Sequence, residues 1–351
     1  MRGMSADATP ETAKQYLAID ALEYSRPSRE RFEEWRAGGL ACVHVTLAIW
    51  ENARATLSVI ASWHDLLREH DDLIALARSA EEIERISASG RTAVLFGFQN
   101  TAPFEDDLGL VRIFHTLGVR IAQLTYNVQN GVAGGCWEEH DSGLSSLYGR
   151  NLVREMNDVG MLIDLSHCGE RTCLETIDFS ERAVAITHAN PAEFVGDDIE
   201  LRGRTRSTAV LRSLVERGGV VGLSPYPRMA PGGSGITLDW FLDMVVWTVE
   251  RLGVDHVGFG TDYYTDYPDE IVKWWRAGRW SRESPVPITG GLVRWPDWFS
   301  SPARFPVILE GLERRGFAPE DVAKLAGGNW LRLFEESFAP RRDVAEAVDV
   351  G

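Results

Sequence analysis

Short apolar runs that end in polar residues recur along the whole chain. The run GMLIDLSHCG, residues 160–169, shows the pattern: branched apolar positions lead into Asp164, Ser166 and His167. Runs of this length and composition favour buried strands over helices. Eight of them predict strands at residues 15–22, 40–48, 92–98, 119–125, 161–166, 183–187, 219–224 and 256–261.

Most segments between these runs carry apolar residues at helical spacing, most clearly at residues 53–70, 142–159, 207–218 and 237–253. Strands that alternate with helices predict a parallel sheet. Eight of them favour an α/β fold of the closed (β/α)8 barrel type, although an open doubly wound sheet would also alternate. We expect a single TIM-like barrel domain over residues 16–337, with a flexible segment at 1–15 and a tail at 338–351.

Composition narrows the possible partners. The chain of 351 residues is 44% hydrophobic, and its net charge of −16 argues against nucleic acid, which needs clustered Lys and Arg. No apolar run approaches the roughly 18 residues of a membrane span, and the polar N-terminus lacks the core of a signal peptide. The four cysteines form no CxxC pair, which is typical of free thiols in a reducing compartment. We therefore expect a cytoplasmic protein with a small-molecule substrate.

Polar residues follow the predicted strands where a barrel places its active site. Gln99 follows the third strand, Tyr126 the fourth, His167 the fifth, His188 the sixth and Asp262 the eighth. Two imidazoles can hold a zinc ion while a carboxylate takes a proton from its water. Each residue alone also has a structural explanation, as a core histidine, a capping residue or a helix N-cap. The prediction of a hydrolytic site therefore depends on their convergence.

The irregular segment 261–291 contains three tryptophans and follows the last predicted strand. Long ordered loops after barrel strands usually cover the active site. We expect the loops at 127–142 and 263–291 to set the preference for substrate.

Four segments of the chain, GRNLVREMNDVGMLIDLSH, AVAITHANP, HVGFGTD and LAGGNWLRLF, resemble the membrane (renal) dipeptidase family. The likeness runs from about residue 17 to 335 and implies an amidohydrolase-like barrel, a zinc-dependent dipeptidase activity and a homodimer. It also implies a role for each matching residue. The zinc ligands would be His167 and His188, with Gln99 as a weak third; Asp262 and Tyr126 would be catalytic; Arg204, Tyr126 and Asn329 would contact substrate.

The chain departs from the family where the second zinc should bind. Leu22 and Tyr24 replace a His-x-Asp ligand pair, Gln99 replaces a bridging glutamate, and Tyr126 replaces a histidine that faces substrate. Leucine cannot bind zinc, and a neutral amide oxygen is a poor bridge between two cations. We therefore expect at most one zinc ion. Three residues could compensate for the missing ligands: His44, Asp20 and Glu23.

Three functions remain open at this point. The first is a hydrolase that cleaves a dipeptide or another small amide with at most one zinc ion. The second is a repurposed enzyme that performs metal-independent acid–base chemistry on a small amino acid derivative. The third is a binding or scaffold protein, which four converging polar groups disfavour because buried polar groups are costly to keep without a use.

Overall fold

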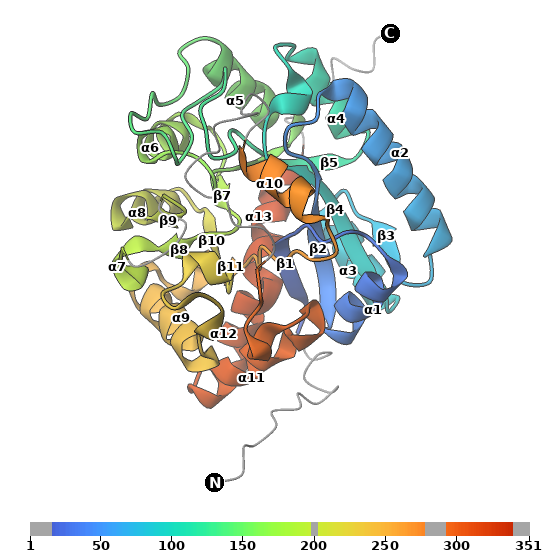
Figure 1. Cartoon of the computed structure of the whole chain (residues 1–351), viewed down its shortest axis with the longest axis vertical. Helices are drawn as coiled ribbons and strands as arrows, with labels where there is room; N and C mark the ends of the chain where they lie inside the picture. The colour runs from blue at the N-terminus through green and yellow to red at the C-terminus, as the bar shows by residue number, and fades with distance from the viewer. Residues whose placement is uncertain (1–15, 198–202, 278–292, 340–351) are drawn as a thin grey trace.

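The computed structural model describes residues 16–197, 203–277 and 293–339, and its centre is a ring of parallel strands. The strands follow one another around the ring in chain order, which confirms the predicted (β/α)8 barrel (Figure 1). Their bounds are β1 (Ala18–Glu23), β2 (Leu40–Ala48), β4 (Thr92–Phe98), β5 (Val119–Gln123), β6 (Leu162–Asp164), β7 (Ala185–Ile186), β10 (Val220–Leu223) and β11 (Val257–Phe259).

Backbone hydrogen bonds beyond the end of β11 join the last strand to the first. The amide of Asp262 donates to Leu22 O at 2.9 Å, and the amide of Tyr24 donates to Tyr263 O at 3.0 Å. These bonds bring the ends of β1 and β11 together. As a result, residues that are 240 positions apart in the chain face the same space.

Helices surround the strands, as Figure 1 shows. Five of them, α1, α2, α3, α8 and α9, begin after a Ser, Asn or Thr whose side chain accepts a backbone N–H of the first turn. None of the described helices has the length and hydropathy of a membrane span. The helix bounds are α1 (Arg29–Ala37), α2 (Ala53–Glu69), α3 (Ala80–Ala88), α4 (Gly109–Thr116), α5 (Tyr148–Val159), α6 (Glu170–Phe179), α7 (Ala192–Val195), α8 (Thr208–Glu216), α9 (Leu238–Leu252), α10 (Asp269–Ala277), α11 (Pro306–Arg314), α12 (Pro319–Ala323) and α13 (Asn329–Phe338).

All eight predicted barrel strands are present, and the differences lie in the smaller elements. β3 (Ile74–Leu76) pairs with β4, and β8 (Asn190–Pro191) pairs with β9 (Thr205–Arg206); none of the three was predicted. α5 begins only at Tyr148, because residue 144 pairs with residue 133 instead of joining a helix. The predicted flexible segment 1–15 and residues 340–351 of the predicted tail 338–351 lie outside the described residues, whereas Phe338 is the last residue of α13.

The barrel interior is filled by side chains that its small residues accommodate. His44 on β2 is fully buried, and its Nδ1 lies 2.6 Å from Ala21 O. A Cβ on Gly97 would lie only 1.9 Å from His44 Nε2 and 2.9 Å from Ile121 O. Glycine at position 97 therefore leaves the space that the imidazole occupies.

We expect Gly97→Ala to lower the free energy of unfolding by about 1–3 kcal/mol, because the added methyl group overlaps a histidine that cannot move freely. Urea denaturation of the wild type and the variant measures the change. In a His44→Ala background, Gly97→Ala should lower the free energy of unfolding by a clearly smaller amount. An equal cost in both backgrounds would contradict this packing.

Candidate active site

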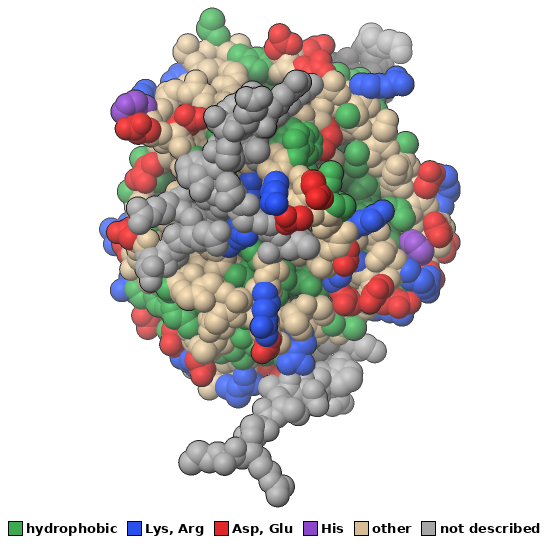
Figure 2. All heavy atoms as spheres, in the orientation of Figure 1, with side chains coloured by type: hydrophobic (Ala, Val, Ile, Leu, Met, Phe, Trp, Pro, Cys, Tyr) green, Lys and Arg blue, Asp and Glu red, His purple; other side chains and the backbone are tan. Residues whose placement is uncertain are grey.

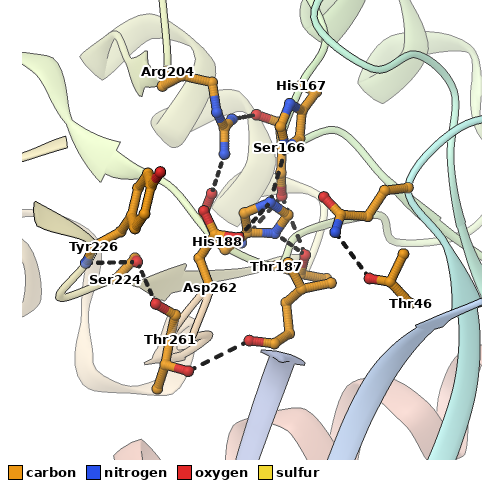
Figure 3. Close-up of polar contacts among 12 residues, drawn as sticks. Thr46, Ser166, His167, Thr187, His188, Arg204, Ser224, Tyr226, Thr261 and Asp262 are labelled. Atoms are coloured by element: carbon orange, nitrogen blue, oxygen red, sulfur yellow. Dashed lines mark hydrogen bonds and ion pairs between the residues drawn. The ribbon is translucent and has the colours of Figure 1, made fainter. Parts of the chain in front are cut away.

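The carboxyl ends of the strands surround a small pocket, with an empty volume of about 310 Å³. Four residues predicted from the sequence line it, namely Tyr126, His167, Arg204 and Asp262. His188 lies beneath them, fully buried and in contact with His167 (Figure 3). The full lining is Tyr24, Tyr126, Asn127, Trp137, His167, Arg204, Tyr226, Asp262 and Arg276.

The two histidines face each other through their Nε2 atoms, which are 3.0 Å apart. The ring of Tyr126 stacks on His167 with centroids 4.3 Å apart. Burial first, and then the positive charge of Arg204, lower the pKa of both imidazoles well below the usual value. Both rings are therefore neutral near pH 7.

The partners of the Nδ1 atoms decide which nitrogen carries the proton. Asn127 Oδ1 lies 2.6 Å from His167 Nδ1, and an amide oxygen can only accept. The Thr187 hydroxyl donates to Asp164 Oδ2 at 2.6 Å, so its oxygen accepts from His188 Nδ1 at 2.7 Å. Both Nδ1 atoms are donors. Both Nε2 atoms therefore present a lone pair to the space between the rings.

Asp262 completes this group of polar side chains. Its Oδ1 is 4.0 Å from His188 Nε2, and burial raises the pKa of its carboxyl to about 7, although Arg204 and Arg276 oppose the shift. Its backbone is left-handed, with φ of 57°, as is that of Asn127, with φ of 61°. Asp and Asn adopt this conformation more readily than most residues.

A buried carboxylate, Asp164, holds the ends of β6 and β7 together. Its Oδ1 accepts from the amide and hydroxyl of Ser166, at 3.0 and 2.6 Å, and from the Thr187 amide at 2.9 Å. Its Oδ2 accepts from the Thr187 hydroxyl. Ser166 and Thr187 directly precede His167 and His188, so this one side chain positions both imidazoles.

Asp20 makes the same arrangement between β1 and β11. It accepts from the Thr261 amide at 2.8 Å, the Thr261 hydroxyl at 2.6 Å and the Leu22 amide at 3.2 Å. Thr261 directly precedes Asp262. Asp20 therefore positions the active-site acid and is not available as a replacement ligand.

Arg204 lies over the histidines, but its guanidinium is partly engaged by the backbone. Nη1 donates to Ser166 O and Nη2 donates to His188 O at 3.3 Å (Figure 3). The side chain is buried and lines the pocket. It can therefore both brace the two histidine strands and present positive charge to a ligand.

Two predicted site residues lie elsewhere. Gln99 is buried at the end of β4, where its Nε2 donates to Thr46 Oγ1 at 2.8 Å, and it does not line the pocket. Its role as a zinc ligand stays a prediction. The structure does not bring Asn329 to the pocket, because its amide donates to Val254 O and Val257 O, both at 2.7 Å. Val257 begins β11, whereas Asp262 follows the opposite end of that strand.

The described residues do not rebuild the missing zinc site. Within them, no group of three His, Cys, Asp or Glu side chains lies close enough to hold a metal ion. His44 faces Gly97 and Ala21, and Glu23 accepts from the Ser25 amide at 3.3 Å. The donors that a two-zinc centre needs are therefore not gathered in the described part of the chain. The His167–His188 pair turns both of its Nε2 lone pairs to one point.

Leu22 and Tyr24, which stand where the family pattern implies a ligand pair, have structural roles. Leu22 is fully buried, and its carbonyl accepts the Asp262 amide that closes the barrel. Tyr24 lines the pocket and stacks on Tyr264, with ring centroids 4.9 Å apart.

Tyr226 and Arg276 are among the pocket residues that were not predicted from the sequence. Tyr226 follows β10, and the Ser224 hydroxyl accepts its amide at 3.1 Å (Figure 3). The signal was present, because a polar residue after the seventh strand also belongs to the ring of strand ends. Arg276 comes from α10, within the segment expected to cover the site, but nothing in its local sequence distinguishes it from other arginines.

A closed parallel barrel with histidines and an acid at its carboxyl ends defines the class of amidohydrolase-like barrels. Within that class, the chain matches the membrane dipeptidase family (peptidase family M19) over residues 20–274, more than half of its length. The chain belongs to this family.

Known relatives agree with the assignment. The chain is 27% identical over 290 residues to Dipeptidase verJ of Clonostachys rogersoniana, covering 82% of this chain and 66% of the relative. It is 26% identical to Dipeptidase tcpJ of Claviceps purpurea, covering 81% and 60%. The chain thus spans about two thirds or less of these two relatives.

Solved structures resemble the whole barrel. An amidohydrolase from Pseudomonas aeruginosa superposes with a TM-score of 0.88 and 33% identity, covering 93% of this chain and 98% of that one. A metallo peptidase from Rhodobacter sphaeroides, liganded with a phosphinate mimic of L-Ala-D-Ala, has a TM-score of 0.75 at 17% identity, covering 92% and 99%. The second likeness shows the fold alone.

We expect Asp164→Asn to lower the free energy of unfolding by about 1–3 kcal/mol, because buried donors lose an ionic acceptor. It should also lower turnover at least tenfold. Asp164 accepts the Thr187 hydroxyl proton, and this bond orients the Thr187 oxygen to accept from His188 Nδ1. Urea denaturation and a steady-state assay measure the two effects. Asp178→Asn, an exposed change on α6, is the matched control. Unaltered stability in Asp164→Asn would contradict the positioning role.

Proposed function

We propose that this protein is a dipeptidase-like hydrolase that cleaves a dipeptide or another small amide, with at most one zinc ion at His167 and His188. Family membership and the named dipeptidase relatives support the general class. The facing Nε2 atoms, 3.0 Å apart, carry the finer proposal. Two neutral imidazoles whose lone pairs converge repel each other unless a cation lies close to both.

Three pocket residues have a role in this reaction, namely Arg204, Asp262 and Tyr126. Arg204 receives the carboxylate of the substrate, since a guanidinium matches its two oxygens. Water adds to the amide carbonyl, Asp262 takes the proton of that water, and the same carboxyl returns it to the leaving nitrogen. A pKa near 7 suits this exchange at neutral pH. Tyr126 packs on His167 and faces the bound substrate. Zinc, when bound, would supply Lewis acidity for the water and the carbonyl.

A second candidate is metal-independent acid–base chemistry on a small amino acid derivative. One observation favours it: among the described residues, no group of three His, Cys, Asp or Glu side chains could hold a metal ion. In that case His167, His188, Asp262 and Tyr126 would perform the proton transfers themselves. Assembly as a homodimer and a cytoplasmic location also belong to the proposal.

Metal analysis separates the two candidates. We expect the purified protein to contain no more than one zinc ion per chain, and chelation followed by dialysis to abolish dipeptide hydrolysis. Added zinc should restore the activity. Elemental mass spectrometry measures the zinc content, and a dipeptide assay measures the rate of hydrolysis. Full activity in metal-free protein would reject the zinc-dependent reaction and leave the second candidate.

We expect His167→Ala to reduce turnover at least a hundredfold while the protein stays folded, because it removes one of two converging nitrogens. Circular dichroism and a steady-state assay measure folding and turnover. His256→Ala is the control, since that ring is partly exposed and, among the described residues, its Nδ1 hydrogen-bonds to Gly219 O. Persistent turnover in His167→Ala would place the active site elsewhere.

A further inference from the structure

An apolar groove lies beside the active-site pocket, between the carboxyl end of β2 and the helices α2 and α10. Its volume is about 330 Å³, and small-molecule sites usually have volumes of about 300 to 1,000 Å³. Figure 2 shows hydrophobic side chains gathered between α10 and α2 on this face of the molecule. The groove therefore has the size and the surface of a ligand site.

Aromatic side chains connect the groove to the active site. Tyr24 lines both cavities, and Trp275 of the groove meets its ring edge-on, with centroids 5.5 Å apart. Trp50 donates its indole N–H to Trp275 O at 2.7 Å and meets the ring of Tyr126 edge-on at 5.7 Å. Tyr126 in turn stacks on His167. A molecule in the groove is therefore next to the wall of the active-site pocket.

The active-site pocket itself leaves little room for a substrate. The space that water can enter is about 20 Å³ there, against about 330 Å³ in the groove. One water molecule needs about 10–15 Å³ by this measure. A substrate whose amide reaches Asp262 therefore has to place most of its bulk outside the pocket, and the groove is an adjoining space of sufficient size.

The lining of the groove favours an uncharged aromatic group. Among the described lining residues only Glu51 carries a charge, and its Oε2 accepts from the amides of Ile49 and Trp50 at 2.7 and 3.0 Å. Aromatic rings pack favourably on one another, and the aromatic side chains of the lining are Tyr24, Trp63, Tyr267, Trp274 and Trp275.

Two large apolar residues of α10 are poorly covered in the groove. Ile271 and Trp274 are each 39% exposed, and both belong to the lining. Exposed apolar side chains that gather in a groove are typical of a binding site.

One polar atom of the groove wall lacks a hydrogen bond. Ser25 follows Tyr24 in the chain, lines the groove and is 6% exposed. Within the part of the chain that the structure describes, its Oγ has no hydrogen-bond partner. An unpaired buried hydroxyl is unfavourable, and a polar atom of a bound ligand would satisfy it.

We propose that the groove binds an aromatic group of the substrate while the amide of the same molecule lies at the active site. This inference rests on the proposed function and narrows it to dipeptides or small amides that carry an aromatic group. Burial of the ring among the side chains of α2 and α10 would hold the amide beside Asp262.

Binding of an unreactive probe tests this site separately from catalysis. Ligand-detected NMR with the purified full-length protein compares phenethyl alcohol with ethanol, because neither has an amide to cleave and the two differ by one phenyl ring. We expect phenethyl alcohol to bind at least tenfold more tightly, as burial of a phenyl ring predicts. Ile271→Glu and Leu66→Glu, which add a charge to the groove from α10 and from α2, should each reduce this preference at least fivefold.

Leu57→Glu is the matched control. Leu57 is an apolar residue of α2 that is 43% exposed and does not line the groove, so the variant carries the same new charge outside the site. The preference for phenethyl alcohol should persist in it. Equal binding of the two alcohols by the wild type, a preference that survives in a folded groove variant, or an equal loss in Leu57→Glu would overturn the proposal.

A second copy of the chain is another possible occupant of the groove, and sedimentation velocity distinguishes it from a substrate. We expect Ile271→Glu and the wild type to have the same oligomeric state. A dimer that dissociates in Ile271→Glu would assign the groove to a contact between copies and overturn the proposal.

A panel of dipeptides then connects the groove to the reaction. Ala-Phe and Phe-Ala are compared with Ala-Ala, from which each differs by one phenyl ring. We expect kcat/KM to be at least tenfold higher for one aromatic member, with the difference lost in Ile271→Glu and kept in Leu57→Glu. If no dipeptide is cleaved while the preference for phenethyl alcohol holds, the proposed function fails and the aromatic site stands. If all three dipeptides are cleaved equally, the aromatic inference fails and the hydrolase stands.

Discussion

Buried carboxylates that tie neighbouring strand ends together hold the active site in place. Asp164 spans β6 and β7, and Asp20 spans β1 and β11. Each accepts a backbone amide and a hydroxyl from the threonine that precedes a site residue, His188 in one case and Asp262 in the other. A buried charge is tolerated only when such bonds satisfy it. The same bonds therefore stabilise the barrel and orient its polar side chains.

Aromatic and aliphatic side chains occupy the two positions where the family pattern implies metal ligands. Tyr24 stands where the family pattern has a ligand, and it now belongs to an aromatic wall with Tyr264 and Trp275. Leu22 contributes a backbone carbonyl to barrel closure. At both positions the structure shows packing and backbone hydrogen bonding.

Electrostatic interactions couple the arginines to the histidine pair and to Asp262, and the low polarity of the buried site strengthens them. Arg204 lowers the pKa of both imidazoles and partly offsets the effect of burial on the Asp262 carboxyl. Burial thus favours the neutral form of the imidazoles and of the Asp262 carboxyl, while the guanidinium groups oppose the shift at Asp262.

Sequence periodicity determined a parallel sheet covered by helices, because eight apolar runs separated by helical segments have few other ways to bury both faces of a sheet. The number of strands favoured a closed barrel, and the structure decided against an open doubly wound sheet. It also placed His167, His188 and Asp262 together, since the ends of parallel strands meet at one rim. Only the tertiary structure decided that Asn329 lies at the other end of β11 and that Arg276 enters the pocket. Those positions depend on how helices and loops pack across the barrel, and such long-range contacts leave no periodic signal in the chain.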